Sequence, residues 1–163
     1  NVLTISSTGM LSINPGASVY IPLYGIIEVK GTLQALGTAT QSVNFLPYPS
    51  TVNWGNIRFY QSTSTLNFVN LKQGNRLNGR PENVNGMLLV NNSNLTISNS
   101  NLWDSEASSI QSTNSVLKIF NTTIGVNVKN KNTRGIKALN GILNLDNVNF
   151  NNLFIFSSAC FFK

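Results

Sequence analysis

The chain has 163 residues and a formal net charge of +6, with 10% charged and 41% hydrophobic residues. Its length predicts one domain, residues 1–163, that is large enough to bury a core, and the even spread of apolar and aromatic residues along the chain argues against disorder. No apolar run approaches the ~18 residues of a membrane span, so membrane insertion is not expected.

The cysteine and histidine content limits which disulfides, general bases and metal ligands the chain can supply. Cys160 is the single cysteine, so no disulfide can form within the chain. This fits either an intracellular location or a bacterial-type surface β-protein. His is absent, which removes the usual general base and the commonest metal ligand. We therefore expect neither a metal nor a cofactor.

Short segments of alternating apolar and polar residues follow one another along the whole chain. In chain order, the clearest are "LSINPGASVYI" (11–21), "GIIEVKGTLQA" (25–35), "WGNIRF" (54–59), "TLNFVN" (65–70), "NLTISN" (94–99), "SVLKIFNTTI" (115–124) and "GILNLDNVNF" (141–150). Alternation with period two is typical of strands, and no segment keeps the 3.6-residue period of a helix. The chain is therefore predicted to be all-β.

Four of these segments share a repeat, in which a Leu is followed two residues later by an apolar residue and four residues later by an Asn. The Leu column is Leu66, Leu95, Leu117 and Leu143; the apolar residues seven positions earlier are Phe59, Leu88, Ile110 and Ile136; the Asn column is Asn70, Asn99, Asn121 and Asn147. Leu11 and Leu33 extend the Leu column backward. A period of this length indicates a repeat architecture.

A parallel β-solenoid explains both the repeat and its uneven steps. Loops of any length can leave a coil while the stacked strands keep register, and the Gly-, Asn- and Pro-rich stretches 46–56 and 72–86 supply such loops. Asn tolerates the left-handed backbone of a turn, and its amide can bind the Asn one coil away. We predict about six coils, one continuous stack of the four Leu residues, and an internal ladder of the four Asn residues.

The motifs resemble those of the right-handed parallel β-helix repeat proteins of the pectate-lyase-like superfold. The resemblance rests on "LSINPGASVYI", "GIIEVKGTLQALGTATQSVNF", "WGNIRF" and "STLNFVNLKQG", and it spans roughly residues 3–150. It implies a right-handed parallel β-helix of the secreted or surface type, with Trp54 packed at a turn of the coil in preference to stacking on a sugar. The superfold hosts lyases, hydrolases and adhesins, so the resemblance implies a fold and no particular activity.

The carboxylates fit the catalytic patterns of that superfold poorly. Its lyases hold Ca²⁺ with clustered Asp and Glu, and its hydrolases use two or three Asp on adjacent coils. Only Asp104 and Glu106 are close among the five carboxylates here, in a Ser- and Ala-rich segment with no sign of the burial that raises a catalytic pKa. We predict no catalytic residues. A polysaccharide lyase or glycoside hydrolase domain, with its catalytic coils outside this segment, is the alternative.

Three loops are expected to leave the coil side by side, just after the Asn column. The first carries Arg76 and Arg80, the second Trp103, Asp104 and Glu106, and the third Lys129, Lys131 and Arg134. The basic loops lack the interleaved aromatic residues of a nucleic-acid platform, so no nucleic acid is expected. Two interpretations stay open: charge complementarity between neighbouring loops, or a shallow glycan site in which Trp103 stacks on a sugar ring.

Neither end of the chain carries a polar cap for the terminal coil. We expect the chain to be a section of a longer protein, or to be covered at one end by another copy or a partner. The favoured function is a structural or adhesive module of a secreted or cell-surface protein. Its loops would contact a polysaccharide or a glycoprotein glycan through Trp103, Asp104, Glu106, Arg76 and Arg80.

Overall fold

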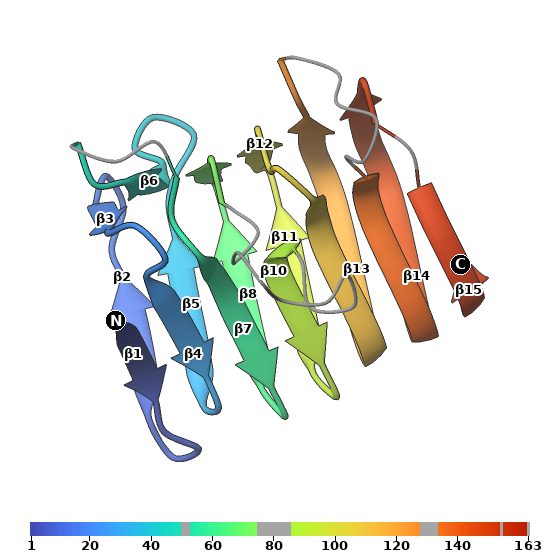
Figure 1. Cartoon of the computed structure of the whole chain (residues 1–163), viewed down its shortest axis with the longest axis horizontal. Helices are drawn as coiled ribbons and strands as arrows, with labels where there is room; N and C mark the ends of the chain where they lie inside the picture. The colour runs from blue at the N-terminus through green and yellow to red at the C-terminus, as the bar shows by residue number, and fades with distance from the viewer. Residues whose placement is uncertain (50–52, 75–85, 128–133, 154, 163) are drawn as a thin grey trace.

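The computed structural model describes the chain except residues 50–52, 75–85, 128–133, 154 and 163, and it describes only the backbone of 155–162 (Figure 1). The described strands are β1 (Val2–Ile5), β2 (Met10–Ile13), β3 (Ser18–Ile21), β4 (Ile26–Val29), β5 (Thr32–Leu36), β6 (Val43–Pro47), β7 (Asn56–Tyr60), β8 (Thr63–Asn67), β9 (Val69–Lys72), β10 (Gly86–Asn91), β11 (Asn94–Ser98), β12 (Asn101–Trp103), β13 (Ser108–Gly125), β14 (Arg134–Asn151) and β15 (Ile155–Phe162). No helix occurs among these residues, as predicted.

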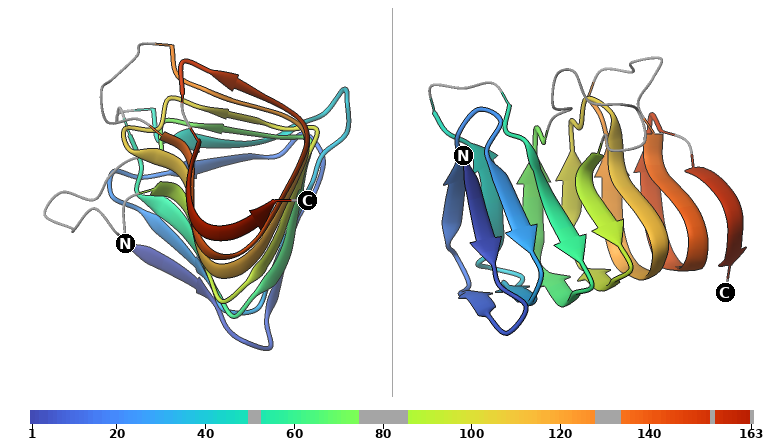
Figure 2. Two further views of the ribbon diagram at one scale, coloured as in Figure 1. Left: turned by 90° about the vertical axis from the view of Figure 1, so that its right-hand side faces the viewer. Right: turned by 60° about the horizontal axis from the view of Figure 1, so that its bottom comes forward.

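The strands stack into a three-sided tube in which every pairing is parallel (Figure 2). One side is β1-β4-β7-β10, the second β2-β5-β8-β11 and the third β3-β6-β9-β12; β13 and β14 each run around all three sides, and β15 begins a further layer. Seen from the C-terminal end, the chain winds counterclockwise while it advances toward the viewer, which is a right-handed coil (Figure 2). The layers make about five turns, slightly fewer than the six coils predicted.

Inward-facing apolar side chains lie in vertical columns that fill the tube. In one column on the first side, Ile27, Ile57, Leu88, Ile110 and Ile136 follow one another in register, and all are at most 3% exposed. Each coil alone has too little apolar surface to form a core, so stacking of neighbours stabilises the fold. The predicted all-β parallel solenoid is confirmed.

The predicted register is wrong at the third coil. Leu66 pairs with Ile97, two residues beyond Leu95, whereas Leu95, Leu117 and Leu143 do form one stack. Phe59 likewise aligns with Val90, because Ile57 is the partner of Leu88. Ser64 takes the predicted place of Leu66 in the Leu column. A two-residue slip leaves every side chain on the same face, so the alternating pattern could not detect it.

The Asn residues lie where one side of the tube bends into the next. At the bend between the second and third sides, Asn99, Asn121 and Asn147 have φ values of 51°, 46° and 50°. Their side chains form a row: Asn147 Nδ2 donates to Asn121 Oδ1 over 2.9 Å, and Asn121 Nδ2 donates to Asn99 Oδ1 over 3.3 Å. The amide row of stacked bends therefore exists as predicted for these three residues.

Asn70 belongs to a different row, which corrects the fourth member of the predicted ladder. Phe68 takes the left-handed position of this bend in the third coil, with a φ of 49°, and Asn67 Oδ1 accepts the amide of Asn99 over 2.9 Å. Asn70 lies on the third side, where it donates to Asn44 and accepts from Asn101, each over 3.0 Å. The cause is the same two-residue slip.

Buried hydroxyl groups make further connections between coils that the sequence pattern did not reveal. Ser93 Oγ accepts the backbone N–H of Ser62 over 3.0 Å, and Ser115 Oγ accepts that of Ser93 over 3.1 Å. At the next bend, Ser100 Oγ accepts the N–H of Val69 over 3.1 Å. These backbone donors at the bends are buried, and the hydroxyls of the next coil satisfy them.

Asn121→Ala is expected to lower the free energy of unfolding by about 2 kcal/mol. The substitution removes two exposed amide hydrogen bonds, at about 0.5 kcal/mol each, and places a Cβ-bearing residue without a local hydrogen bond in the left-handed region, at about 1 kcal/mol. Urea unfolding of Asn121→Ala and Asn121→Gly separates the loss of the hydrogen bonds from the cost of the left-handed backbone, because Gly tolerates that backbone conformation. Equal stability of the Gly variant and the wild type would contradict a stabilising amide row.

Candidate functional site

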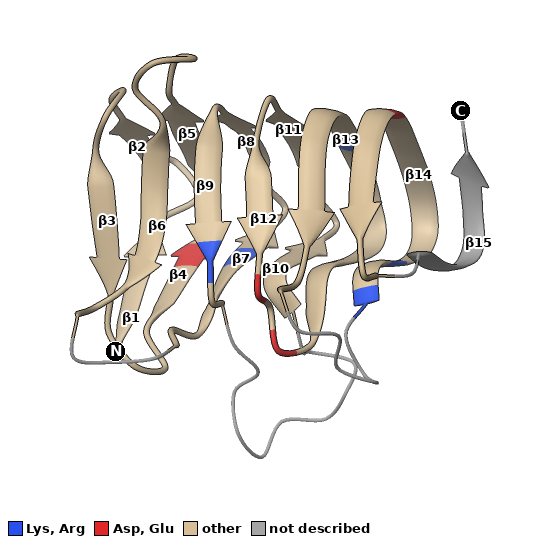
Figure 3. Cartoon of the chain, turned by 90° about the horizontal axis from the view of Figure 1, so that it is seen from above, with Lys and Arg blue, Asp and Glu red and all other residues tan. Residues whose placement is uncertain are grey.

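The predicted site lies at the bend that follows the third side of the tube, after β9 and β12. In Figure 3 the acidic stretch after β12 lies close to the blue end of β9, which is Lys72. Trp103, Asp104 and Glu106 are described there. Arg76, Arg80, Lys129 and Lys131 lie outside the described residues, so the predicted alternation of basic and acidic loops stays a prediction.

Trp103 ends β12 and projects from the outer surface of the third side. It is in register between Lys72 of β9 and Gly125 of β13. Its indole covers Gly125: a Cβ on that glycine would lie 2.7 Å from Cζ3 and 2.9 Å from Cη2 of the ring. Trp103 is half-buried as a result. The ring is thus held against the backbone of the next coil, and part of its surface stays exposed to solvent.

Asp104 forms the bend itself. Its φ is 58°, in the left-handed region that Asn and Asp tolerate better than most residues. Its carboxylate binds the next coil, since Oδ1 accepts the backbone N–H of Asn127 over 2.8 Å and Oδ2 accepts the Asn127 side-chain amide over 2.6 Å. Asp104 therefore orders two successive bends beside Trp103.

Glu106 binds a different segment of the chain. Its Oε1 accepts the side-chain amide of Asn53 over 2.8 Å. Asp104 and Glu106 are thus held by two separate Asn residues, one from the following coil and one from the segment before β7. Two carboxylates thus follow Trp103 in the same segment, and carboxylate oxygens suit hydrogen bonds to hydroxyl groups.

Trp54 is a structural residue. It is fully buried, and its Nε1 donates to the backbone carbonyl of Lys72 over 2.6 Å. Its backbone forms a parallel bridge with Gly74. The side chain has no exposed surface on which a sugar could stack, so Trp54 has the packing role expected from the resemblance.

Arg134, the described member of the third predicted loop, begins β14 beside this bend, where its backbone N–H donates to the Ala107 carbonyl over 3.3 Å, while other charged side chains lie on the first side of the tube. Glu28 forms an ion pair with Lys30 over 3.0 Å, and the neighbouring Arg58 Nε donates to Asn56 Oδ1 over 2.8 Å on the outside of the first side. Within the part of the chain that the structure describes, no group of three or more His, Cys, Asp or Glu residues is placed to hold a metal. The described residues contain no helix, and therefore none that is long and apolar enough to cross a membrane.

Comparisons with known proteins give no relative from which a site could be transferred. No family model, no curated protein and no solved structure matches the chain. The resemblance to the pectate-lyase-like superfold stays a prediction from the sequence motifs, and what the structure shows is a parallel β-solenoid.

Proposed function

We propose that the chain is a structural and adhesive module of a secreted or cell-surface protein. It acts as a stiff spacer and binds glycan chains at the bend formed by Trp103, Asp104 and Glu106. The observation that supports the spacer role is the continuous interior: apolar columns run from Ile5 to Leu143, and rows of hydrogen bonds connect the bends of successive coils. Such a tube resists bending because each interior layer is hydrogen-bonded to the layers on both sides of it.

The binding role rests on the chemistry beside Trp103. A half-buried indole held against the backbone offers apolar surface at little cost in side-chain entropy. The Asp104 and Glu106 carboxylates accept hydrogen bonds from sugar hydroxyls, and the exposed Lys72 ammonium donates them. Neutral or weakly acidic polysaccharides with accessible hydroxyls are the ligand class that this combination fits.

A glycan array combined with two turnover assays tests the proposal. Saturable binding is expected without release of reducing ends and without formation of unsaturated products. Turnover would favour the alternative, a lyase or hydrolase domain, and would overturn the proposal. A chain that binds no glycan and turns none over would leave only the spacer.

Trp103→Ala provides the residue-level test of the same site. It should weaken binding to the array's best ligand by about tenfold or more, because an aromatic stacking contact contributes about 0.5–1.5 kcal/mol beyond its buried area. Tyr20→Ala is the matched control, since Tyr20 is an exposed aromatic residue on the same side of the tube, three coils away. Equal losses in the two variants would contradict a site at Trp103.

A further inference from the structure

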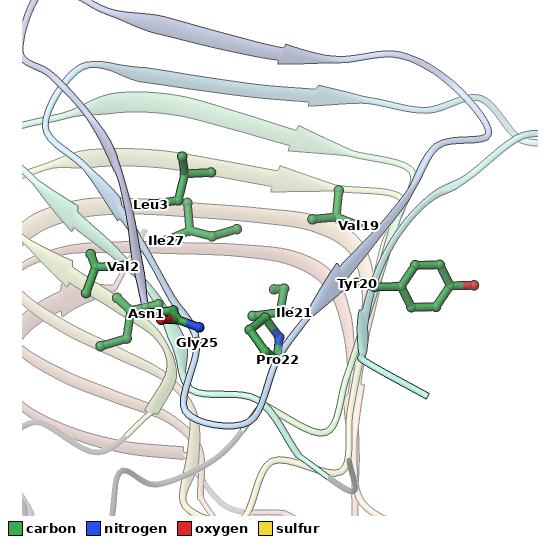
Figure 4. A pocket seen from close by; sticks show the side chains of 10 residues that line it. Asn1, Val2, Leu3, Val19, Tyr20, Ile21, Pro22, Gly25 and Ile27 are labelled. Atoms are coloured by element: carbon green, nitrogen blue, oxygen red, sulfur yellow. The ribbon is translucent and has the colours of Figure 1, made fainter. Parts of the chain in front are cut away.

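The outer face of the third side of the tube carries two straight columns of side chains, with one member from each coil. Figure 4, a close view of the apolar hollow at the first coil, shows the alternation that produces them: Tyr20 points away from the tube, whereas Val19 and Ile21 point into it. The strands are in parallel register, so successive outward side chains lie about 4.8 Å apart. The first column is Ser18, Asn44, Asn70, Asn101, Thr123 and Asn149, and the second contains Lys72, Trp103, Gly125 and Asn151.

The row of amides in the first column ends at the level of Trp103. Asn70 Nδ2 donates to Asn44 Oδ1, and Asn101 Nδ2 donates to Asn70 Oδ1, each over 3.0 Å. Thr123 stands where the next amide would be, and among the described residues neither its hydroxyl nor Asn101 Oδ1 has a hydrogen-bond partner. Asn101 is exposed and Thr123 is half-buried, so an acceptor and a hydroxyl group are left open on this face.

These two open groups lie beside the indole of Trp103. The six-membered ring covers Gly125, the next residue of the second column. Outward residues two apart on a strand are about 7 Å from each other, so Asn101 precedes Trp103 and Thr123 precedes Gly125 by that distance. The two oxygens of Asp104, in contrast, already accept hydrogen bonds from the next coil. Asn101 and Thr123 are therefore the unengaged polar groups beside a ligand that rests on the ring.

The face is narrow across the strands and long along the axis of the tube. β9 and β12, which lie side by side in Figure 3, are four and three residues long, so each presents only two outward side chains. Along the axis, the second column continues in register from Lys72 through the next three coils to Asn151. The length of one sugar unit in an extended glycan is close to the coil spacing. A linear glycan along the axis can therefore place one unit over each of these coils.

We propose that the glycan bound at Trp103 is an extended, unbranched chain that lies along the axis of the tube, with Asn101 and Thr123 as specificity-determining residues. This inference rests on the glycan site proposed above and adds the class of its ligand and the orientation. One sugar ring stacks on the indole. Its hydroxyl groups donate to Asn101 Oδ1 and accept from the Thr123 hydroxyl, and neighbouring units lie over the coils of Lys72 and Asn151.

Titration calorimetry with linear glucan and galacturonan oligosaccharides of increasing length tests the orientation. The affinity should rise with each added sugar unit up to about four units and then level off, because the second column spans the coils from Lys72 to Asn151 at about 4.8 Å each. A glycan that lay across the strands would find only two outward side chains on β9 or β12, so its affinity would level off at about two units.

Asn101→Ala and Thr123→Val test the two specificity-determining residues. Each removes a neutral hydrogen bond to the sugar, so each should weaken binding of the oligosaccharides that have reached full affinity by about threefold to tenfold. Asn44→Ala is the matched control, because Asn44 is also hydrogen-bonded to Asn70 over 3.0 Å on this face but lies two coils before Trp103. The control should bind like the wild type. Urea unfolding checks that all three variants are folded.

The possible results separate this inference from the glycan site itself. If no oligosaccharide binds, the site and the orientation fail together. If Trp103→Ala abolishes binding while Asn101→Ala and Thr123→Val leave it unchanged, the site stands and the role of the two residues is overturned. A single sugar unit that binds as tightly as the longer oligosaccharides would also leave the site standing, but it would contradict a chain that lies along the axis.

Discussion

Phe59→Ala is expected to lower the free energy of unfolding by about 3–5 kcal/mol, the range for removing a buried aromatic side chain. Phe59 is completely buried in the third coil and is stacked between Val29 below and Val90 above. The backbone of each coil is fixed by the hydrogen bonds to both neighbours, so the tube cannot collapse around the missing ring. The cavity therefore persists, and the loss of contacts is not recovered.

Urea unfolding followed by circular dichroism measures this effect. Tyr60→Ala is the control: it removes a similar ring one residue later, where the side chain lies on the outer face and is half-buried. The control should cost clearly less than Phe59→Ala, with an unchanged dependence of the unfolding free energy on urea. Similar losses in both variants would mean that the columns do not form the core.

Gly141→Ala should destabilise the fold by about 3 kcal/mol or more. Gly141 follows the bend in β14 and has a φ of 150°, a conformation that residues with a side chain rarely adopt. A Cβ there would lie 2.2 Å from the backbone oxygen and 2.8 Å from the backbone nitrogen of Ser115, its register partner one coil earlier. Backbone atoms in a paired ladder cannot move aside, so strain and overpacking add.

Gly16→Ala separates the clash from the backbone conformation. Gly16 also has a positive φ, of 80°, but the nearest atom to an added Cβ, the Cβ of Gln41, is 3.8 Å away. This variant should cost only about 1 kcal/mol, the penalty of the left-handed conformation. If thermal or urea unfolding gave equal losses for the two glycines, the close approach of successive coils at Gly141 would be contradicted.

The sequence predicted the solenoid because its strands alternate strictly and its apolar columns recur at the same places in successive coils. Leu95, Leu117 and Leu143 stack as expected, and so do Leu88, Ile110 and Ile136. In the third coil, Ser64 stands where the neighbouring coils have an apolar residue of the Leu column. The sequence pattern therefore aligns Leu66 with Leu95, whereas Ser64 is the actual partner of Leu95. Only the hydrogen-bond register distinguishes alignments that differ by two residues.

The candidate site was harder to predict because its contacts join segments far apart in the sequence. The pairing of Asp104 with Asn127 and that of Glu106 with Asn53 depend on how loops of different coils meet. The role of Gly125 in seating Trp103 is equally invisible in a pattern of apolar residues. What the sequence did indicate was that Trp103 and the two carboxylates would share one loop at the edge of the tube.

Engineered disulfides test the stacking of coils most directly. In a Cys160→Ser background, the pair Thr65→Cys and Thr96→Cys occupies register partners on β8 and β11, about 4.8 Å apart. The pair Thr65→Cys and Asn94→Cys is displaced by two residues, about 8 Å apart and beyond the reach of a disulfide. Mild oxidation and peptide mass mapping should give a cross-link between positions 65 and 96 and none between 65 and 94. A cross-link in the second pair alone, or in neither pair of a folded chain, would contradict side chains stacked coil over coil in this register.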